Sequence, residues 1–156
     1  MDVGAKDMML GKYFSKRELE RSATATRLGL SNAIPDNLLD NAKLVASKLD
    51  IIREHFDRPV RVLSCYRSPI VNSAVGGSTT SAHRFAMAAD VEIDGVSILE
   101  LCRWCRDNIA DYDQIIYEFG EEGWMHIGFT NGIPRKQLLT AKKVKGKTEY
   151  TEGLHE

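Results

Sequence analysis

Cysteine, long apolar runs and clustered positive charge are all scarce in this chain. Only three of the 156 residues are cysteines, and such a small, odd number argues against a framework of disulfide bonds. No apolar run approaches the length needed to cross a membrane. The 21 Lys and Arg residues are scattered and are offset by 22 Asp and Glu residues, so no basic stripe marks a nucleic-acid-binding surface. We therefore expect neither a membrane span nor a nucleic acid partner.

The start of the chain, "MDVGAKDMMLGKYF", has no positive segment followed by an apolar one, so it predicts no ordinary secretory signal. We expect the protein to be made and folded in the cytoplasm. The length suits one domain with a hydrophobic core and is short for two. We predict a single domain over residues 1–139, followed by a polar, mobile tail over 140–156, because that stretch is charged and lacks an apolar period. We expect a monomer.

Three helices are predicted from caps and apolar periods. Ser15 and Glu18 have the spacing of a capping box, which opens a short helix. A longer helix follows Pro35, and a third runs from about Ser97 to Asn108. The longer helix carries a continuous apolar stripe: Leu38, Ala42, Val45, Leu49, Ile52 and Phe56.

The predicted strands are "VRVLSCY", "ADVEIDG", "YDQIIYEF" and "WMHIGF", and "GEEG" joins the last two as a hairpin. The stretch "NSAVGGSTTSAH", residues 72–83, reads as a loop because Gly, Ser and Thr dominate it. The order of elements predicts an α+β fold, in which helices pack against a small antiparallel sheet.

Four histidines make the search for a metal site short. His55 lies near the end of the long helix, where a cation complements the helix dipole, and His155 in the tail is expected to be inert. His83 and Asp90 are separated mainly by small side chains, which would let the backbone approach a metal ion. This spacing also arises by accident, so the pair alone is weak evidence.

His126 shares one strand face with Trp124 and Gly128, which leaves room beside its ring. A solvated strand histidine remains the alternative at this point.

Cys102 and Cys105 have the C-x-x-C spacing of zinc and redox sites, but no second pair exists. Both thiols lie on the apolar face of their helix, so we predict that they are buried core residues.

Two stretches resemble a known family: "SCYRSPIVNSAVGGSTTSAHRFAMAADV" and "YDQIIYEFGEEGWMHIGF". They are similar to the zinc D-Ala-D-Ala carboxypeptidase family of peptidoglycan peptidases, which includes phage endolysins. Its wider superfamily contains lysostaphin and the hedgehog signalling domain. The family pattern is Ser-x-His-x-x-Gly-x-Ala-x-Asp, with a distal Trp-x-His or His-x-His on a strand. The matching residues here are Ser81, His83, Ala88, Asp90, Trp124 and His126, whereas Ala86 stands in place of the family glycine.

The resemblance implies a hedgehog/DD-peptidase-like fold and a Zn²⁺ ion held by His83, Asp90 and His126. The fourth position would hold a water that the metal activates as the nucleophile. Arg67 would anchor a substrate carboxylate or oxyanion, and Ser81 would bind substrate or steady the His83 loop. Asn72, Gly76 and Gly77 are expected to shape the loop.

The general base is expected to be Glu118, because hedgehog-like members carry a glutamate in the matching strand. Glu121 and Glu122 compete, since other members place it three residues before the last histidine, which is Gly123 here. A regular four-residue "GEEG" loop would turn Glu118 to the wrong face. We therefore predict an irregular hairpin that pairs Glu118 with Trp124 or His126.

The leading interpretation is a zinc metallopeptidase that cleaves peptidoglycan stem peptides, as a DD-carboxypeptidase or endopeptidase. The resemblance favours a phage or prophage lysis enzyme, which would reach the cell wall after holin-type release or from a virion. The alternative is a zinc-containing binding domain of the hedgehog type, without turnover.

Overall fold

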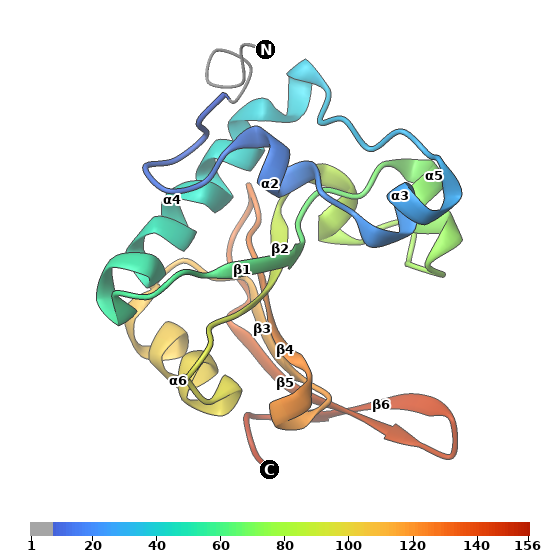
Figure 1. The fold of residues 1–156 in the computed structure, drawn as a ribbon. Helices are drawn as coiled ribbons and strands as arrows, with labels where there is room; N and C mark the ends of the chain where they lie inside the picture. Colours follow the sequence, from blue (N-terminus) through green and yellow to red (C-terminus); the bar gives the residue numbers. More distant parts are fainter. Residues whose placement is uncertain (1–7) are drawn as a thin grey trace.

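The computed structural model describes residues 8–156 and shows helices gathered around one sheet (Figure 1). Residues 1–7, which are part of the stretch in which the sequence predicts no secretory signal, lie outside the described residues. The α-helices are α2 (Lys16–Glu20), α3 (Ala23–Leu28), α4 (Leu39–Phe56), α5 (Pro69–Ala74) and α6 (Ile98–Asn108). The 3₁₀-helices are η1 (Asp36–Leu38), η2 (Ala82–Phe85) and η3 (Gly120–Glu122).

The sheet has six strands in the order β1-β2-β4-β3-β5-β6. They are β1 (Arg61–Ser64), β2 (Ala88–Glu92), β3 (Gln114–Glu118), β4 (Trp124–Gly128), β5 (Gln137–Val144) and β6 (Lys147–Glu152). All neighbours pair antiparallel except β3 and β5, which are parallel. The predicted α+β class, with helices against a mostly antiparallel sheet, is confirmed.

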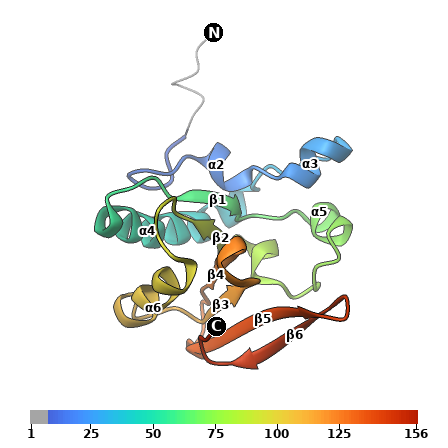
Figure 2. The same ribbon diagram turned by 60° about the horizontal axis from the view of Figure 1, so that its bottom comes forward.

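Helices α4 and α6 lie on the same side of the sheet (Figures 1 and 2). The predicted stripe of α4 is confirmed, because Ala42, Val45, Leu49 and Ile52 are fully buried in the core. No helix within residues 8–156 is long and apolar enough to cross a bilayer.

Cys102 and Cys105 on α6 are also buried, as predicted. Burial raises the pKa of both thiols, so they stay protonated at neutral pH. The C-x-x-C spacing of Cys102 and Cys105 therefore places both thiols on the buried face of α6.

The starts of α2 and α6 agree with the sequence prediction, whereas α5 was not predicted. Ser15 forms the predicted capping box with Glu18, and Ser97 caps α6. The predicted loop over 72–83 is wrong at both ends, because residues 82–83 belong to η2 and residues 72–74 belong to α5. Ser68 accepts a hydrogen bond from the amide of Val71, and Pro69 occupies the first turn, so the serine-proline pair starts this short helix.

Residues 140–156, predicted as a polar, mobile tail, contain most of β5 and all of β6 in the structure. β5 adds to β3, and β6 pairs back along β5. Lys145 and Gly146 form a two-residue turn in which both have positive φ, a geometry that matches the twist of a hairpin. An outer hairpin needs few buried side chains, and Thr140 and Ala141 supply them. The other positions of this hairpin can therefore be charged, so its strands lack the alternating apolar pattern by which strands are predicted from sequence.

Candidate metal centre and active-site cleft

Three side chains that can bind a metal converge from η2, β2 and β4. Asp90 and His126 are direct cross-strand partners, so they project from the same face of the sheet. Oδ1 of Asp90 lies 3.0 Å from Nδ1 of His126 and 3.3 Å from Nε2 of His83. The three candidate ligand atoms all lie within 4.8 Å of one another. One ion could contact all three, as the sequence predicted for His83, Asp90 and His126.

The main chain just after β1 sets the orientation of the His83 ring. Its Nδ1 lies 2.7 Å from the carbonyl oxygen of Cys65, which can only accept a hydrogen bond. Nδ1 therefore carries the proton, and Nε2 keeps a lone pair that points toward Asp90. This is the arrangement that metal-binding histidines use.

The carboxyl of Asp90 is ionised in this setting. Burial works against its charge, but the imidazoles of His83 and His126 outweigh burial and lower the pKa of Asp90. A charged carboxylate between two imidazoles is a donor set that zinc accepts readily. The residues present thus fit the implied metal.

Ala86 ends η2 in the left-handed conformation, with φ of 56°. Its amide bonds back to the carbonyls of Ala82 and His83, which closes the turn carrying the histidine. A left-handed residue other than glycine costs roughly 1–2 kcal/mol. The family pattern has glycine here, so this chain keeps the turn with a strained alanine.

The hairpin between β3 and β4 has the irregular geometry that the sequence predicted. Glu118 pairs with Trp124, and Ile116 pairs with His126, so Glu118 stands on the same face as the histidine. Five residues make the connection, and Phe119 enters it with a positive φ of 63°. A Cβ on Gly123 would lie 1.8 Å from the carbonyl oxygen of Glu118, which explains why that position carries no side chain.

The three glutamates proposed as bases differ sharply in their surroundings. Glu118 lines the same cavity as the cluster, whereas Glu121 and Glu122 do not. Glu121 accepts hydrogen bonds from the amides of Ile98 and Leu99 and from the hydroxyl of Tyr117, at 2.7, 3.1 and 2.6 Å. Glu122 is exposed. The carboxylate of Glu121 thus binds the first amides of α6.

Burial raises the pKa of Glu118 to about 7, and the charge of Asp90 adds to this effect. His126 and Arg67 act in the opposite direction. A carboxyl with this pKa can both accept and release a proton near neutral pH.

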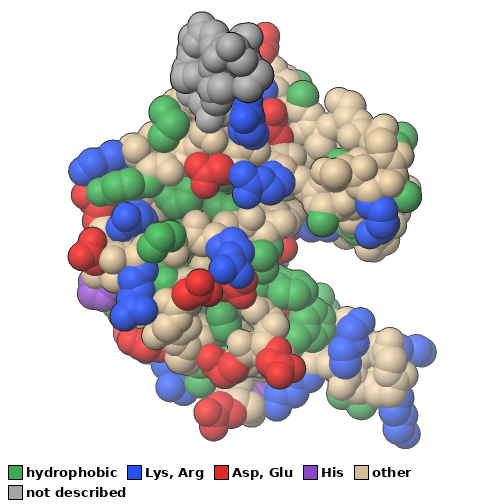
Figure 3. All heavy atoms as spheres, viewed as in Figure 1, with side chains coloured by type: hydrophobic (Ala, Val, Ile, Leu, Met, Phe, Trp, Pro, Cys, Tyr) green, Lys and Arg blue, Asp and Glu red, His purple; other side chains and the backbone are tan. Residues whose placement is uncertain are grey.

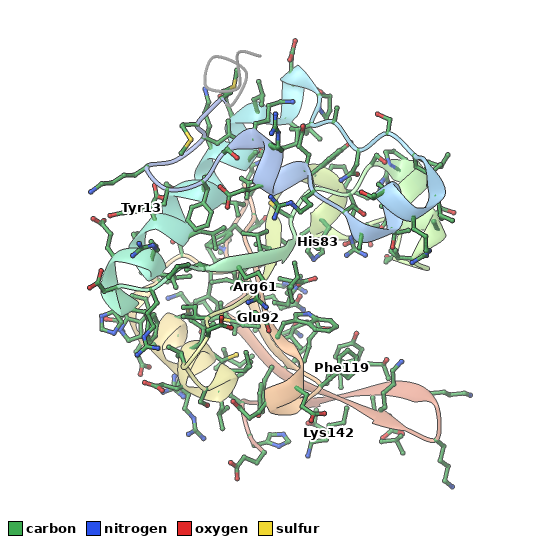
Figure 4. All side chains as sticks on the ribbon, in the orientation of Figure 1. Tyr13, Arg61, His83, Glu92, Phe119 and Lys142 are labelled. Carbon is green, nitrogen blue, oxygen red and sulfur yellow. The ribbon has the colours of Figure 1, made fainter. Side chains whose placement is uncertain are left out.

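The cavity beside the cluster has a volume of about 1040 Å³. Figure 3 shows a deep notch between two lobes, and Figure 4 shows His83 at its inner side. One wall comes from residues 75–78 and 80–82, and the other includes Leu139 and Tyr150. Leu139 and Tyr150 are not among the residues predicted for the site, because the predicted domain ends at residue 139 and Tyr150 falls in the predicted tail. The Lys145-Gly146 turn was the signal that could have revealed them.

Arg67 and Ser81 both line this cavity. Nη2 of Arg67 lies 3.5 Å from Oγ of Ser81, and its buried Nε has no hydrogen-bond partner among the described residues. Ser81 also accepts a bond from the amide of His83, so it helps to hold η2. The guanidinium of Arg67 therefore lies in the cavity wall with N–H donors that no described residue uses.

The loop before Ser81 is shaped as expected by Asn72 and Gly77. Asn72 is buried, and its side-chain amide donates a hydrogen bond to the carbonyl of Ser78. The main-chain carbonyl of Asn72 accepts a hydrogen bond from the amide of Gly77. A Cβ on Gly77 would lie 2.1 Å from Oδ1 of Asn72, so the close approach requires glycine.

Comparison with known proteins agrees with this geometry. The family model of peptidase M15 matches residues 12–128, three quarters of the chain. The chain belongs to the peptidase M15 family. It is accordingly a metallopeptidase by family, and its His-Asp-His cluster fits a metal site. A search of curated proteins found no match. In this M15 peptidase β5 and β6 lie beyond the matched residues.

Proposed function

We propose that this protein is a zinc peptidase that hydrolyses peptide bonds in peptidoglycan stem peptides, as a DD-carboxypeptidase or an endopeptidase. The observation that carries the proposal is the meeting of His83, Asp90 and His126 at one wall of a large cavity in an M15 chain. Mixed imidazole and carboxylate donors favour zinc over harder cations such as magnesium.

His83, Asp90 and His126 would hold the metal ion, which would supply a Lewis acid and lower the pKa of a water molecule. Glu118 accepts a proton from the attacking water as its oxygen bonds to the peptide carbonyl carbon. The same carboxyl then delivers that proton to the leaving nitrogen as the carbon–nitrogen bond breaks. Its raised pKa suits both steps.

Arg67 binds the substrate carboxylate or the developing oxyanion. Its guanidinium lies in the cavity wall, where partial burial strengthens a pairing with an anion. Ser81 steadies both Arg67 and the turn that carries His83. The resemblance to phage endolysins further suggests a lysis enzyme that reaches the wall after holin-type release or from a virion.

The test is digestion of purified muropeptides, followed by mass spectrometry of the products. We expect the wild type to release a fragment whose mass identifies the bond cleaved. Glu118→Ala should retain zinc and lose activity by at least about 100-fold, as expected for loss of a general base. Glu122→Ala, which alters an exposed neighbour, should retain activity. A wild type that binds zinc but cleaves no muropeptide would favour the binding domain of the hedgehog type.

A further inference from the structure

The hairpin of β5 and β6 lies beyond the family match, yet it forms part of the active-site cleft. Leu139 and Tyr150 line the same cavity as His83, Asp90 and His126. Figures 1 and 2 show the two strands side by side, extending outward from the sheet. In Figure 3 this segment forms the lower of the two lobes that flank the notch.

The register places Tyr150 on the face that carries Glu118. Glu118 pairs with Ala141 across β3 and β5, and Ala141 pairs with Tyr150 across β5 and β6. Paired residues of neighbouring strands project from the same face. Ala141 is fully buried and short, so only a methyl group stands between the two longer side chains.

Electrostatics agree with this placement. Partial burial raises the pKa of Tyr150, and the negative charge of Glu118 raises it further. The phenol is therefore protonated at neutral pH and available as a hydrogen-bond donor.

Tyr150 is 55% exposed, and its hydroxyl has no hydrogen-bond partner in the part of the chain that the structure describes. The residue next to it, Glu149, projects from the opposite face, where it pairs with Lys142. Figure 4 shows Lys142 on the outer side of the hairpin and Phe119 on the side that faces the notch. Tyr150 thus presents an open ring and a free donor to the cleft.

The wall that carries Tyr150 is fixed to the ligand-bearing strands. The ring of Phe119 packs edge-on against Trp124 at 5.4 Å, and Nζ of Lys143 lies 5.5 Å from the centre of the same ring. The amide of Phe119 also donates to the carbonyl of Ala141. These contacts connect the middle of β5 to the β3–β4 connection, next to the strand partner of Tyr150.

We propose that Tyr150 is a substrate-contact residue, which donates a hydrogen bond to a carbonyl or carboxylate oxygen of the peptide on the Glu118 side of the cleft. Its ring covers the small apolar side chains of that peptide. The inference rests on the proposed function, because it names a residue that binds the substrate of that same site.

The test is steady-state kinetics of Tyr150→Phe and Tyr150→Ala on a muropeptide that the wild type cleaves, with Glu149→Ala as the matched control. Loss of one neutral hydrogen bond should raise KM by about threefold or more in Tyr150→Phe. Tyr150→Ala should lower kcat/KM by about tenfold or more, mainly through KM, because the ring contact is lost as well. Zinc content should not change in any variant.

Tyr150→Ala with the same KM as Glu149→Ala, in a protein that cleaves muropeptide, would overturn the inference and leave the proposed function intact. Equal KM values for Tyr150→Phe and the wild type would overturn the hydrogen bond even if Tyr150→Ala failed to fold. A wild type that cleaves no peptide would instead contradict the proposed function, and the inference with it.

Discussion

Cys65, Ala86 and Gly123 shape the site through their backbones. The carbonyl of Cys65 fixes the tautomer of His83, Ala86 closes the turn that carries it, and Gly123 lets the chain pass the carbonyl of Glu118. Each is a small residue at a place where the main chain comes close to a functional group. Precise placement of the reactive side chains depends on such residues as much as on the ligands.

The pH dependence of activity should report Glu118. The base must be ionised to act, and burial raises the pKa of Glu118 to about 7 from an ordinary 4.5, while a bound cation would lower it. We expect kcat/KM to fall on the acid side with a midpoint between these values. Removing a positive charge that lowers this pKa should move the midpoint to higher pH, so Arg67→Met should shift the acid limb upward.

Arg61→Met is the matched control, because Arg61 pairs with Glu92 and Asp94 away from the cavity lining. The measurement is a pH profile of kcat/KM for the three proteins. If the midpoint of the acid limb has the same pH in Arg67→Met as in the wild type, Arg67 does not influence the pKa of Glu118.

At the residue scale, the sequence predicted the cluster but not its supports. His83, Asp90 and His126 could be picked out because imidazole and carboxylate groups can bind a metal and because their motifs resemble a family. The structure brings the three together. The role of the Cys65 carbonyl could not be predicted, since every residue has a carbonyl and only the fold aims this one at His83.

The β3–β4 hairpin shows how an element can be predicted from a chemical requirement. Glu118 can face Trp124 only if the connection is irregular, and the five-residue connection with Phe119 in the left-handed region meets that condition. α5 and the β5–β6 hairpin were missed for the opposite reason. α5 has only six residues, and β6 has no buried position, so neither gives a clear apolar pattern.

Glu121 should matter for stability and not for catalysis. Its carboxylate accepts two amide hydrogen bonds at the start of α6 and one from Tyr117, which ties the hairpin to the helix. We expect Glu121→Ala to lower the free energy of unfolding by about 1–2 kcal/mol, as for the loss of a helix cap. Denaturant unfolding measures this change, with Glu122→Ala as a control near zero.

Peptidase activity per folded molecule should be unchanged in Glu121→Ala. If zinc content and stability were retained while activity fell as far as in Glu118→Ala, the assignment of the base would have to move to Glu121.

The whole molecule joins a rigid ligand platform to an open cleft. β2 and β4, which carry Asp90 and His126, are interior strands with neighbours on both sides. The helices α4 and α6 cover one side of the sheet, and the notch opens between the α5–η2 region and the β5–β6 hairpin (Figures 1 and 3). Interior strands resist distortion, so the ligands should be prearranged before a metal binds.

Metal stoichiometry tests the central claim most directly. Elemental analysis of the purified protein should find about one zinc ion per chain, consistent with a single site of three protein ligands. His126→Ala should lose the bound zinc, whereas His155→Ala, which removes a histidine that bonds to Thr151 outside the cluster, should retain it. A wild type without bound metal, or a His126→Ala variant that keeps its full zinc content, would contradict the account.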